Sequence, residues 1–174
     1  MPNQTFHFLN VKDGDCSIIE HASGHVSVID VCNARKIAIT ESLEEQKYMS
    51  ERSKQGNYNQ KKYPVNPIDY LRKFKISSVF RFMVTHPDMD HIDGIKDFFE
   101  VFNPANYYDT DNNAEKDFTN NNFQRYREED WLFYKKLRNT NPQTDPKRIT
   151  IFSGDDASYR TKDWEDKRPG DAFY

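Results

Sequence analysis

A run of six residues, His86-Pro87-Asp88-Met89-Asp90-His91, holds four side chains that can bind a metal ion. Imidazole nitrogen and carboxylate oxygen are both good ligands for first-row divalent metals. The apolar run 78–84 before it is typical of a buried strand, and residues 92–102 after it have the apolar spacing of a helix face. The six residues are therefore predicted to form a strand-to-helix turn on which the four side chains converge.

Each of these residues also has an ordinary structural explanation. Asp88 or Asp90 could cap the helix that begins near residue 91, by accepting a hydrogen bond from a backbone N–H. His86 could be a strand-end histidine with an ordinary partner. The metal hypothesis therefore depends on the combination of residues, and it leaves open whether this polypeptide binds a metal by itself.

The hexapeptide resembles the His-x-His-x-Asp-His signature of the metallo-β-lactamase superfamily, with Asp88 in place of the second histidine. The His-x-Asp-x-Asp-His variant is most similar to the hydrolase domain of DNA-uptake competence proteins and their relatives. Residues 10–19 are similar to the family's first hairpin with its Gly-Asp turn, and residues 26–30 are similar to its strand that ends in an aspartate beside the metal site. The resemblance covers residues 6–102 and implies a metal-dependent hydrolase.

In such a hydrolase His86 and Asp88 would face one divalent ion, and Asp90 and His91 would face a second, with Asp90 also in a catalytic role. Asp30 would lie behind these ligands and orient one of them or a water molecule. Two ions about 3.5–4 Å apart hold a bridging hydroxide and clamp the scissile bond. Because Asp88 supplies a hard oxygen, the resemblance implies Mn²⁺ or Mg²⁺ in preference to Zn²⁺, which stays the other candidate.

The favoured activity is hydrolysis of a phosphodiester in DNA or RNA by a metal-bound hydroxide, because hard ions neutralise phosphate charge. One alternative is hydrolysis of a small ester, thioester or lactone. A third hypothesis is a non-catalytic regulatory or binding module with an incomplete metal site, since no histidine follows His91. Three small basic clusters near tyrosines, at 61–62, 72–75 and 135–138, could contact phosphates and bases, although a solvated helix or loop face is the preferred explanation for each.

The periodicity predicts an α/β fold, matching one half of the αβ/βα sandwich that the resemblance implies. Strands are expected at 5–11, 16–22, 25–31, 78–84, from 107, and at 148–152; helices at 33–47, 67–74, 92–102 and 124–138; and a polar loop at 50–64. Asn66 is the expected N-cap of the second helix, with Pro67 at its first position.

A chain of 174 residues has the length of a single domain. The family fold needs a second half with further ligands, so the resemblance implies that residues 1–174 are the N-terminal portion of the domain. A second polypeptide, either the C-terminal half or a separate subunit, would complete it. The face carrying Val28, Val84 and Ile151 is the expected contact, because half a sandwich leaves one sheet face uncovered.

Composition excludes some classes of function. The net charge of −3 and the pI near 6.0 give no global basic field, so any nucleic-acid contact depends on a local patch. The mean hydropathy is −0.99, and nothing resembles a signal peptide or the ~20 apolar residues of a membrane span. A cytoplasmic protein is expected, and the sparse cysteines fit a reducing compartment.

The remaining histidines and the cysteines are expected to be structural. Cys16 and Cys32 are interpreted as small core residues in preference to a disulfide or a metal site. His7, His21 and His25 fall in the first strands, far in sequence from the hexapeptide, and are expected on the solvated surface.

Overall fold

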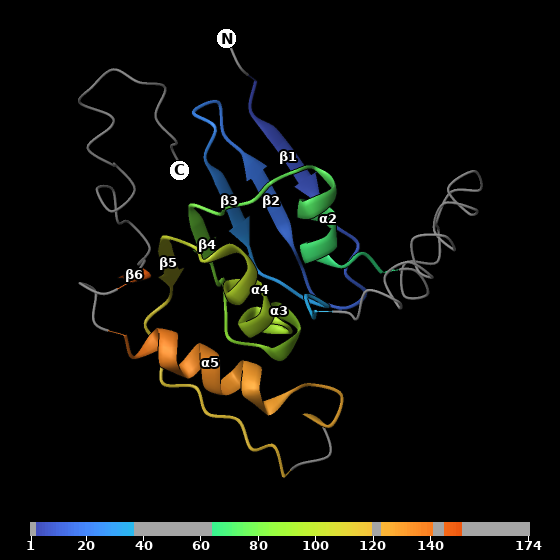
Figure 1. The fold of residues 1–174 in the computed structure, drawn as a ribbon. Helices are drawn as coiled ribbons and strands as arrows, with labels where there is room; N and C mark the ends of the chain where they lie inside the picture. Colours follow the sequence, from blue (N-terminus) through green and yellow to red (C-terminus); the bar gives the residue numbers. More distant parts are fainter. Residues whose placement is uncertain (1–2, 37–63, 120–122, 141–144, 151–174) are drawn as a thin grey trace.

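A single mixed sheet organises the part of the chain that the computed structural model describes, residues 3–36, 64–119, 123–140 and 145–150 (Figure 1). Its six strands are ordered β1-β2-β3-β4-β5-β6. The elements are β1 (Thr5–Phe8), β2 (Ser17–Glu20), β3 (Val26–Ile29), α2 (Pro67–Lys73), β4 (Arg81–Met83), α3 (Met89–Ile92), α4 (Ile95–Phe102), β5 (Asn106–Asp109), α5 (Glu128–Arg138) and β6 (Lys147–Thr150). The predicted α/β class is confirmed, with strands shorter than the apolar runs.

Connection type divides the sheet into two parts. Strands β1, β2 and β3 pair antiparallel through short turns, whereas β3, β4, β5 and β6 are mutually parallel. Parallel neighbours need a long crossover, and α2, α3 with α4, and α5 lie in these three crossovers. The carboxyl ends of β3 and β4 therefore meet at one edge of the sheet, which is where Asp30 and the His86–His91 turn begin.

The core lies between the helices and one face of the sheet. Because strand residues alternate between faces, Ile18, Val28 and Phe82 point to the same side and are fully buried. The ring of Phe82 contacts those of Phe98 and Phe99, with centroid distances of 5.2 and 5.0 Å. Full burial of such side chains stabilises the fold by roughly 1.5–3 kcal/mol each.

The prediction that Val28, Val84 and Ile151 form a face in contact with a second polypeptide is wrong for two of these residues. Val28 and Val84 both belong to the core cluster, because the register pairs Val28 with Phe82 on the helix-covered side. Ile151 lies outside the described residues. The opposite face begins at β1 with Phe6 and Phe8, whose side chains are 56% and 81% exposed.

Backbone chemistry explains where the helices begin and end. The Asn66 side chain accepts hydrogen bonds from the first turn of α2, as predicted. The single helix predicted over 92–102 is instead split into α3 and α4 at Gly94, which has a φ of 88°. A β-carbon at Gly94 would lie 2.3 Å from the carbonyl of Ala34, so only glycine allows this close approach.

Other expectations about side chains and segments have mixed outcomes. The prediction that His21 lies on the solvated surface is wrong: this residue is 5% exposed, and its Nε2 lies 2.8 Å from the Ser27 hydroxyl oxygen. Cys16 and Cys32 are buried free thiols, as predicted. Residues 33–36 are not helical, and the rest of the predicted 33–47 helix lies outside the described residues, as does almost all of the 50–64 loop.

Candidate metal centre

Asp30 is the buried residue around which the site is arranged. It follows β3 with a φ of 56°, and only 2% of it is exposed. One carboxylate oxygen accepts from the Thr85 backbone N–H at 2.8 Å, and the other from the Thr85 hydroxyl at 2.6 Å and from Nδ1 of His91 at 2.9 Å. Asp30 therefore joins the end of β3 to the turn after β4 and to α3, as a residue behind the ligands should.

These hydrogen bonds determine the proton positions on both histidines. Since Nδ1 of His91 donates to Asp30, its Nε2 keeps a lone pair. The Thr85 hydroxyl proton also goes to Asp30, so the Thr85 oxygen accepts from Nδ1 of His86, 3.0 Å away. In the neutral form His86 therefore also has the lone pair on its Nε2, and for both histidines this is the tautomer that a metal ligand needs.

Three of the four predicted ligands lie together. The rings of His86 and His91 have centroids 3.9 Å apart, and Nε2 of His86 is 3.5 Å from a carboxylate oxygen of Asp88. Asp88 is the N-cap residue of α3 by backbone position, but its side chain makes no capping hydrogen bond. The capping explanation for Asp88 is therefore excluded, and its carboxylate, 61% exposed, is directed to His86 and Lys116.

Asp90 faces a different neighbourhood. No hydrogen bond or ion pair within the described part of the chain joins its carboxylate to His86, Asp88 or His91. Its negative charge instead contributes to raising the pKa values of Cys32 and Tyr126, which line the adjacent pocket. Its metal-binding and catalytic roles stay predictions.

The Gly-Asp turn of the first hairpin packs directly on α3. A β-carbon on Gly14, whose φ is 71°, would lie 1.8 Å from the carbonyl oxygen of Asp90. No side chain fits there, because the distance is far below van der Waals contact. Glycine at this position lets the hairpin reach the turn that carries the candidate ligands.

The ligand chemistry fits a divalent ion, but the set is incomplete within these ranges. Among residues 3–36, 64–119, 123–140 and 145–150, no three or more His, Cys, Asp or Glu side chains form a group that could hold a metal ion. His86, Asp88 and His91 can supply two imidazole nitrogens and a carboxylate oxygen on one side of the turn. An ion bound there would require side-chain movement or further ligands.

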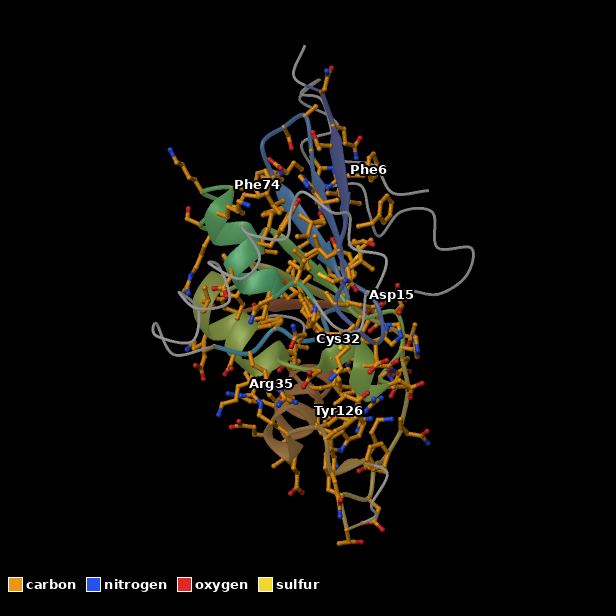
Figure 2. The ribbon with its side chains drawn as sticks, turned by 90° about the vertical axis from the view of Figure 1, so that its right-hand side faces the viewer. Phe6, Asp15, Cys32, Arg35, Phe74 and Tyr126 are labelled. Carbon is orange, nitrogen blue, oxygen red and sulfur yellow. The ribbon has the colours of Figure 1, made fainter. Side chains whose placement is uncertain are left out.

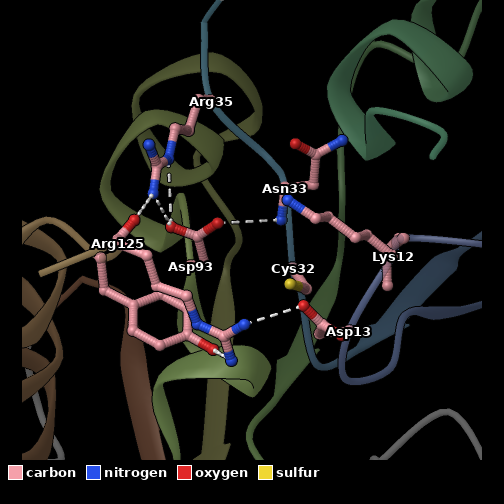
Figure 3. A pocket seen from close by; sticks show the side chains of 9 residues that line it. Lys12, Asp13, Cys32, Asn33, Arg35, Asp93 and Arg125 are labelled. Carbon is pink, nitrogen blue, oxygen red and sulfur yellow. Dashed lines mark hydrogen bonds and ion pairs between the residues drawn. The ribbon is translucent and has the colours of Figure 1, made fainter. Parts of the chain in front are cut away.

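A pocket of about 140 Å³ opens beside this turn, and ion pairs neutralise most of its charges (Figure 3). Arg35 pairs with Asp93 at 2.7 Å, and Arg125 pairs with Asp13 at 3.0 Å. The Lys12 side chain extends across the pocket. The lining residues are Val11, Lys12, Asp13, Cys32, Asn33, Arg35, Asp93, Arg125 and Tyr126.

Asp93 has a structural role in this pocket. It is 6% exposed and accepts from the Asn33 backbone N–H at 3.3 Å as well as from Arg35, so it holds the segment after β3. Burial, followed by the charges of Asp93 and Asp90, raises the pKa of Cys32 to about 12. This thiol is therefore protonated at neutral pH. Cys32, Arg35 and Tyr126 lie toward the opposite end of the molecule from Phe6 and Phe74 (Figure 2).

The predicted nucleic-acid clusters are only partly available. In the 135–138 cluster, Arg138 is 7% exposed and Tyr134 is fully buried, so neither can contact a phosphate or a base as predicted. The reason is that this face of α5 packs on the core. The 61–62 cluster lies outside the described residues, and a role for the exposed 72–75 cluster stays a prediction.

Sequence reasoning missed three residues of the site. Thr85, which orients both Asp30 and His86, directly precedes the hexapeptide and could have been included for that reason. Lys116 and Arg125 come from segments with no recognisable motif. They reach the site only through the packing of α5 and its connections.

Comparison with known proteins does not assign a family. The sequence matches no protein-family model, and no curated protein matches it. Within the described ranges, no helix has the length and apolar composition needed to cross a membrane.

Proposed function

We propose that this chain carries the ligand-bearing part of a divalent-metal-dependent phosphodiesterase with a metallo-β-lactamase-like αβ/βα sandwich. The observation that carries the proposal is the pair of contacts behind the turn: both histidine Nδ1 atoms are engaged, through Asp30 and Thr85, so in the neutral imidazoles both Nε2 atoms carry the lone pair, that of His86 next to Asp88, a second proposed ligand. The helices on one face of a mixed sheet are compatible with the sandwich.

The proposed roles are those that the resemblance implies, and the Asp30–His91 contact is the one that supports them directly. His86 and Asp88 would hold one ion, and His91 and Asp90 a second, while Asp30 keeps His91 in the correct tautomer and orientation. Asp90 is the proposed acceptor for the proton of the attacking water. A divalent ion, when bound, supplies charge neutralisation for the phosphate and lowers the pKa of water.

Two parts of the proposal extend beyond the described residues. Further ligands would come from a second polypeptide, either the C-terminal half of the domain or a separate subunit, and the substrate would be DNA or RNA. A non-catalytic module is the second candidate, because no ligand group of three or more is assembled among the described residues. The experiments below separate these possibilities.

Paramagnetic broadening tests the ion site directly, because Mn²⁺ broadens the resonances of nearby nuclei even when it binds weakly. We expect Mn²⁺ to broaden the imidazole signals of His86 and His91 before those of His25, at the opposite end of β3. His91→Ala should weaken Mn²⁺ binding by more than the roughly 10-fold that loss of an outer-shell partner produces. His25→Ala is the matched control. Equal broadening of all histidines would overturn the proposal.

Hydrolysis assays then test the activity and the need for a partner. We expect the isolated chain to bind one ion or fewer and to gain phosphodiesterase activity when completed, measured with bis(p-nitrophenyl) phosphate. A monomer that binds two ions tightly and is active contradicts the need for a partner. Metal binding without hydrolysis in the completed protein supports the non-catalytic module, and hydrolysis of p-nitrophenyl acetate alone supports the ester alternative.

The metal preference follows from Asp88. We expect higher activity with Mn²⁺ than with Zn²⁺, and Asp88→His should shift the preference toward Zn²⁺ because imidazole replaces a hard oxygen. Assays of both proteins with a panel of divalent metals measure this preference. If Asp88→His leaves the order of activities among the metals unchanged, the argument from the hard Asp88 oxygen is contradicted.

A further inference from the structure

The segment that follows β5 is held along α5 by side-chain contacts. The Asn112 amide donates to the Tyr134 hydroxyl oxygen at 2.8 Å, and Arg138 donates to the carbonyl oxygen of Ala114 at 2.8 Å. Arg138 also pairs with Glu115 at 3.3 Å. Figure 1 shows this segment running beside α5. These contacts place the next residue, Lys116, at the turn that carries the candidate ligands.

Lys116 is unusually enclosed for a lysine. Its side chain is 11% exposed, and its ammonium lies 5.5 Å from the ring centroid of Phe123 and 5.4 Å from that of Trp131. The nitrogen is 3.1 Å from one carboxylate oxygen of Asp88, while the other oxygen of Asp88 faces Nε2 of His86. The aromatic rings stabilise the cation and restrict the orientation of the side chain, so the ammonium group is held next to the candidate metal centre.

The hydrogen-bonding capacity of this ammonium exceeds what its neighbours use. An ammonium has three N–H donors. Within the described residues, Asp88 is its one hydrogen-bond acceptor, and the rings of Phe123 and Trp131 accept none of the conventional bonds. Two donors therefore have no acceptor among the described residues, and the oxygen atoms of a bound ligand would satisfy them.

We propose that Lys116 is a substrate-contacting residue that binds a non-bridging oxygen of an anionic phosphodiester at the His86–Asp88–His91 turn. This inference rests on the proposed function and sharpens it, because a fixed positive charge favours an anionic substrate over a neutral ester. Lys116 and Asp88 also lie on the same side of the turn, so a phosphate near Asp88 is within reach of the ammonium.

A purely structural ion pair is the competing explanation, and it accounts for less. Asp88 is 61% exposed, and ion pairs with an exposed partner typically contribute about 0–1 kcal/mol. The segment is already anchored by Asn112 and Arg138, so it does not depend on Lys116. A role toward a ligand explains why a lysine is enclosed at this particular place.

Binding of inorganic phosphate and of a thymidine dinucleotide, followed by NMR without metal, tests the inference apart from activity. We expect Lys116→Met to weaken binding of both about tenfold and Lys116→Arg to retain most of it. Lys96→Met is the matched control, because Lys96 is likewise paired with a carboxylate, that of Glu129 at 2.6 Å, belongs to none of the predicted binding clusters and should leave binding unchanged. Equal affinities for wild type and Lys116→Met would overturn the inference.

Kinetics of the completed protein give a second readout. Lys116→Met should raise KM for bis(p-nitrophenyl) phosphate about tenfold and leave KM for neutral p-nitrophenyl acetate unchanged. If Lys116→Met fails to fold, the Nζ resonance of Lys116 in ¹⁵N-lysine-labelled wild type must shift on phosphate addition; no shift overturns the inference. Phosphate binding that depends on Lys116 without any hydrolysis would refute the proposed function alone, and hydrolysis unaffected by Lys116→Met would refute this inference alone.

Discussion

Two buried aspartates end parallel strands of the same sheet, yet their surroundings differ. Asp30 follows β3 and receives three hydrogen bonds, from the backbone and hydroxyl of Thr85 and from His91. Asp109 ends β5 and is 1% exposed; one of its oxygens accepts from Arg148 at 3.1 Å, and the other has no hydrogen-bond partner among the described residues.

This difference has an electrostatic consequence. Burial raises the pKa of Asp109, because desolvation outweighs the opposing effect of Arg148. Asp30, equally buried, is surrounded by donors that suit a carboxylate. The number and direction of donors, more than burial itself, therefore distinguish a carboxylate that can orient a ligand from one that is only enclosed in the fold. Substitutions of Asp30 and Asp109 can break or sharpen this contrast, and substitution of Gly14 tests the hairpin that packs against the site.

The largest effect is expected from Asp30→Ala. It would leave the Thr85 donors and Nδ1 of His91 without acceptors and place alanine at a positive φ, so the free energy of unfolding should fall by about 3 kcal/mol or more. Urea unfolding measures this. Asparagine tolerates the positive φ and keeps one side-chain acceptor, so Asp30→Asn should lower the free energy of unfolding by less than Asp30→Ala does, while it still weakens Mn²⁺ binding. Equal stability of Asp30→Ala and wild type would contradict the conclusion that the site is arranged around Asp30.

A smaller effect is expected where the first hairpin meets the site. Gly14→Ala should lower the free energy of unfolding by roughly 2 kcal/mol or more. The added β-carbon would overlap the Asp90 carbonyl, and alanine would have to adopt a positive φ. Gly24→Ala is the control: its φ is 87° but no atom lies within 4 Å, so only about 1 kcal/mol should be lost. Thermal unfolding of both variants gives the comparison, and equal losses would show that the hairpin does not press on α3.

The smallest effect is expected from Asp109→Asn, and it depends on pH. A raised pKa in the folded protein means that the aspartate favours folding fully below its unfolded value of 3.8, and that this contribution is lost as pH rises through the folded pKa. Asparagine does not titrate. The stability of wild type relative to Asp109→Asn should therefore fall as the pH is raised from about 4 to 7. A difference that is constant with pH, or of opposite sign, would contradict the account of Asp109.

Much of the local structure follows from short stretches of sequence. The hexapeptide predicts the strand-to-helix turn, Asn66 with Pro67 predicts the start of α2, and Gly14 predicts the hairpin turn. Such features depend on neighbours within a few residues, through capping hydrogen bonds, backbone conformations that favour glycine, and apolar periodicity. The break between α3 and α4 was missed, because close approach of Gly94 to Ala34 depends on a distant segment.

The arrangement of the site was decided by packing between distant parts of the chain. His91 acquires its tautomer from Asp30, 61 residues away, and Asp88 meets Lys116, which is 28 residues away in a segment without a motif. Val28 proved to face the helices because of its register with Phe82, a pairing that periodicity cannot assign. The sequence by itself determined which residues could act as ligands, since side-chain chemistry is local. Tertiary structure alone decided which atoms of those residues are available, because hydrogen-bond partners depend on how strands and helices pack.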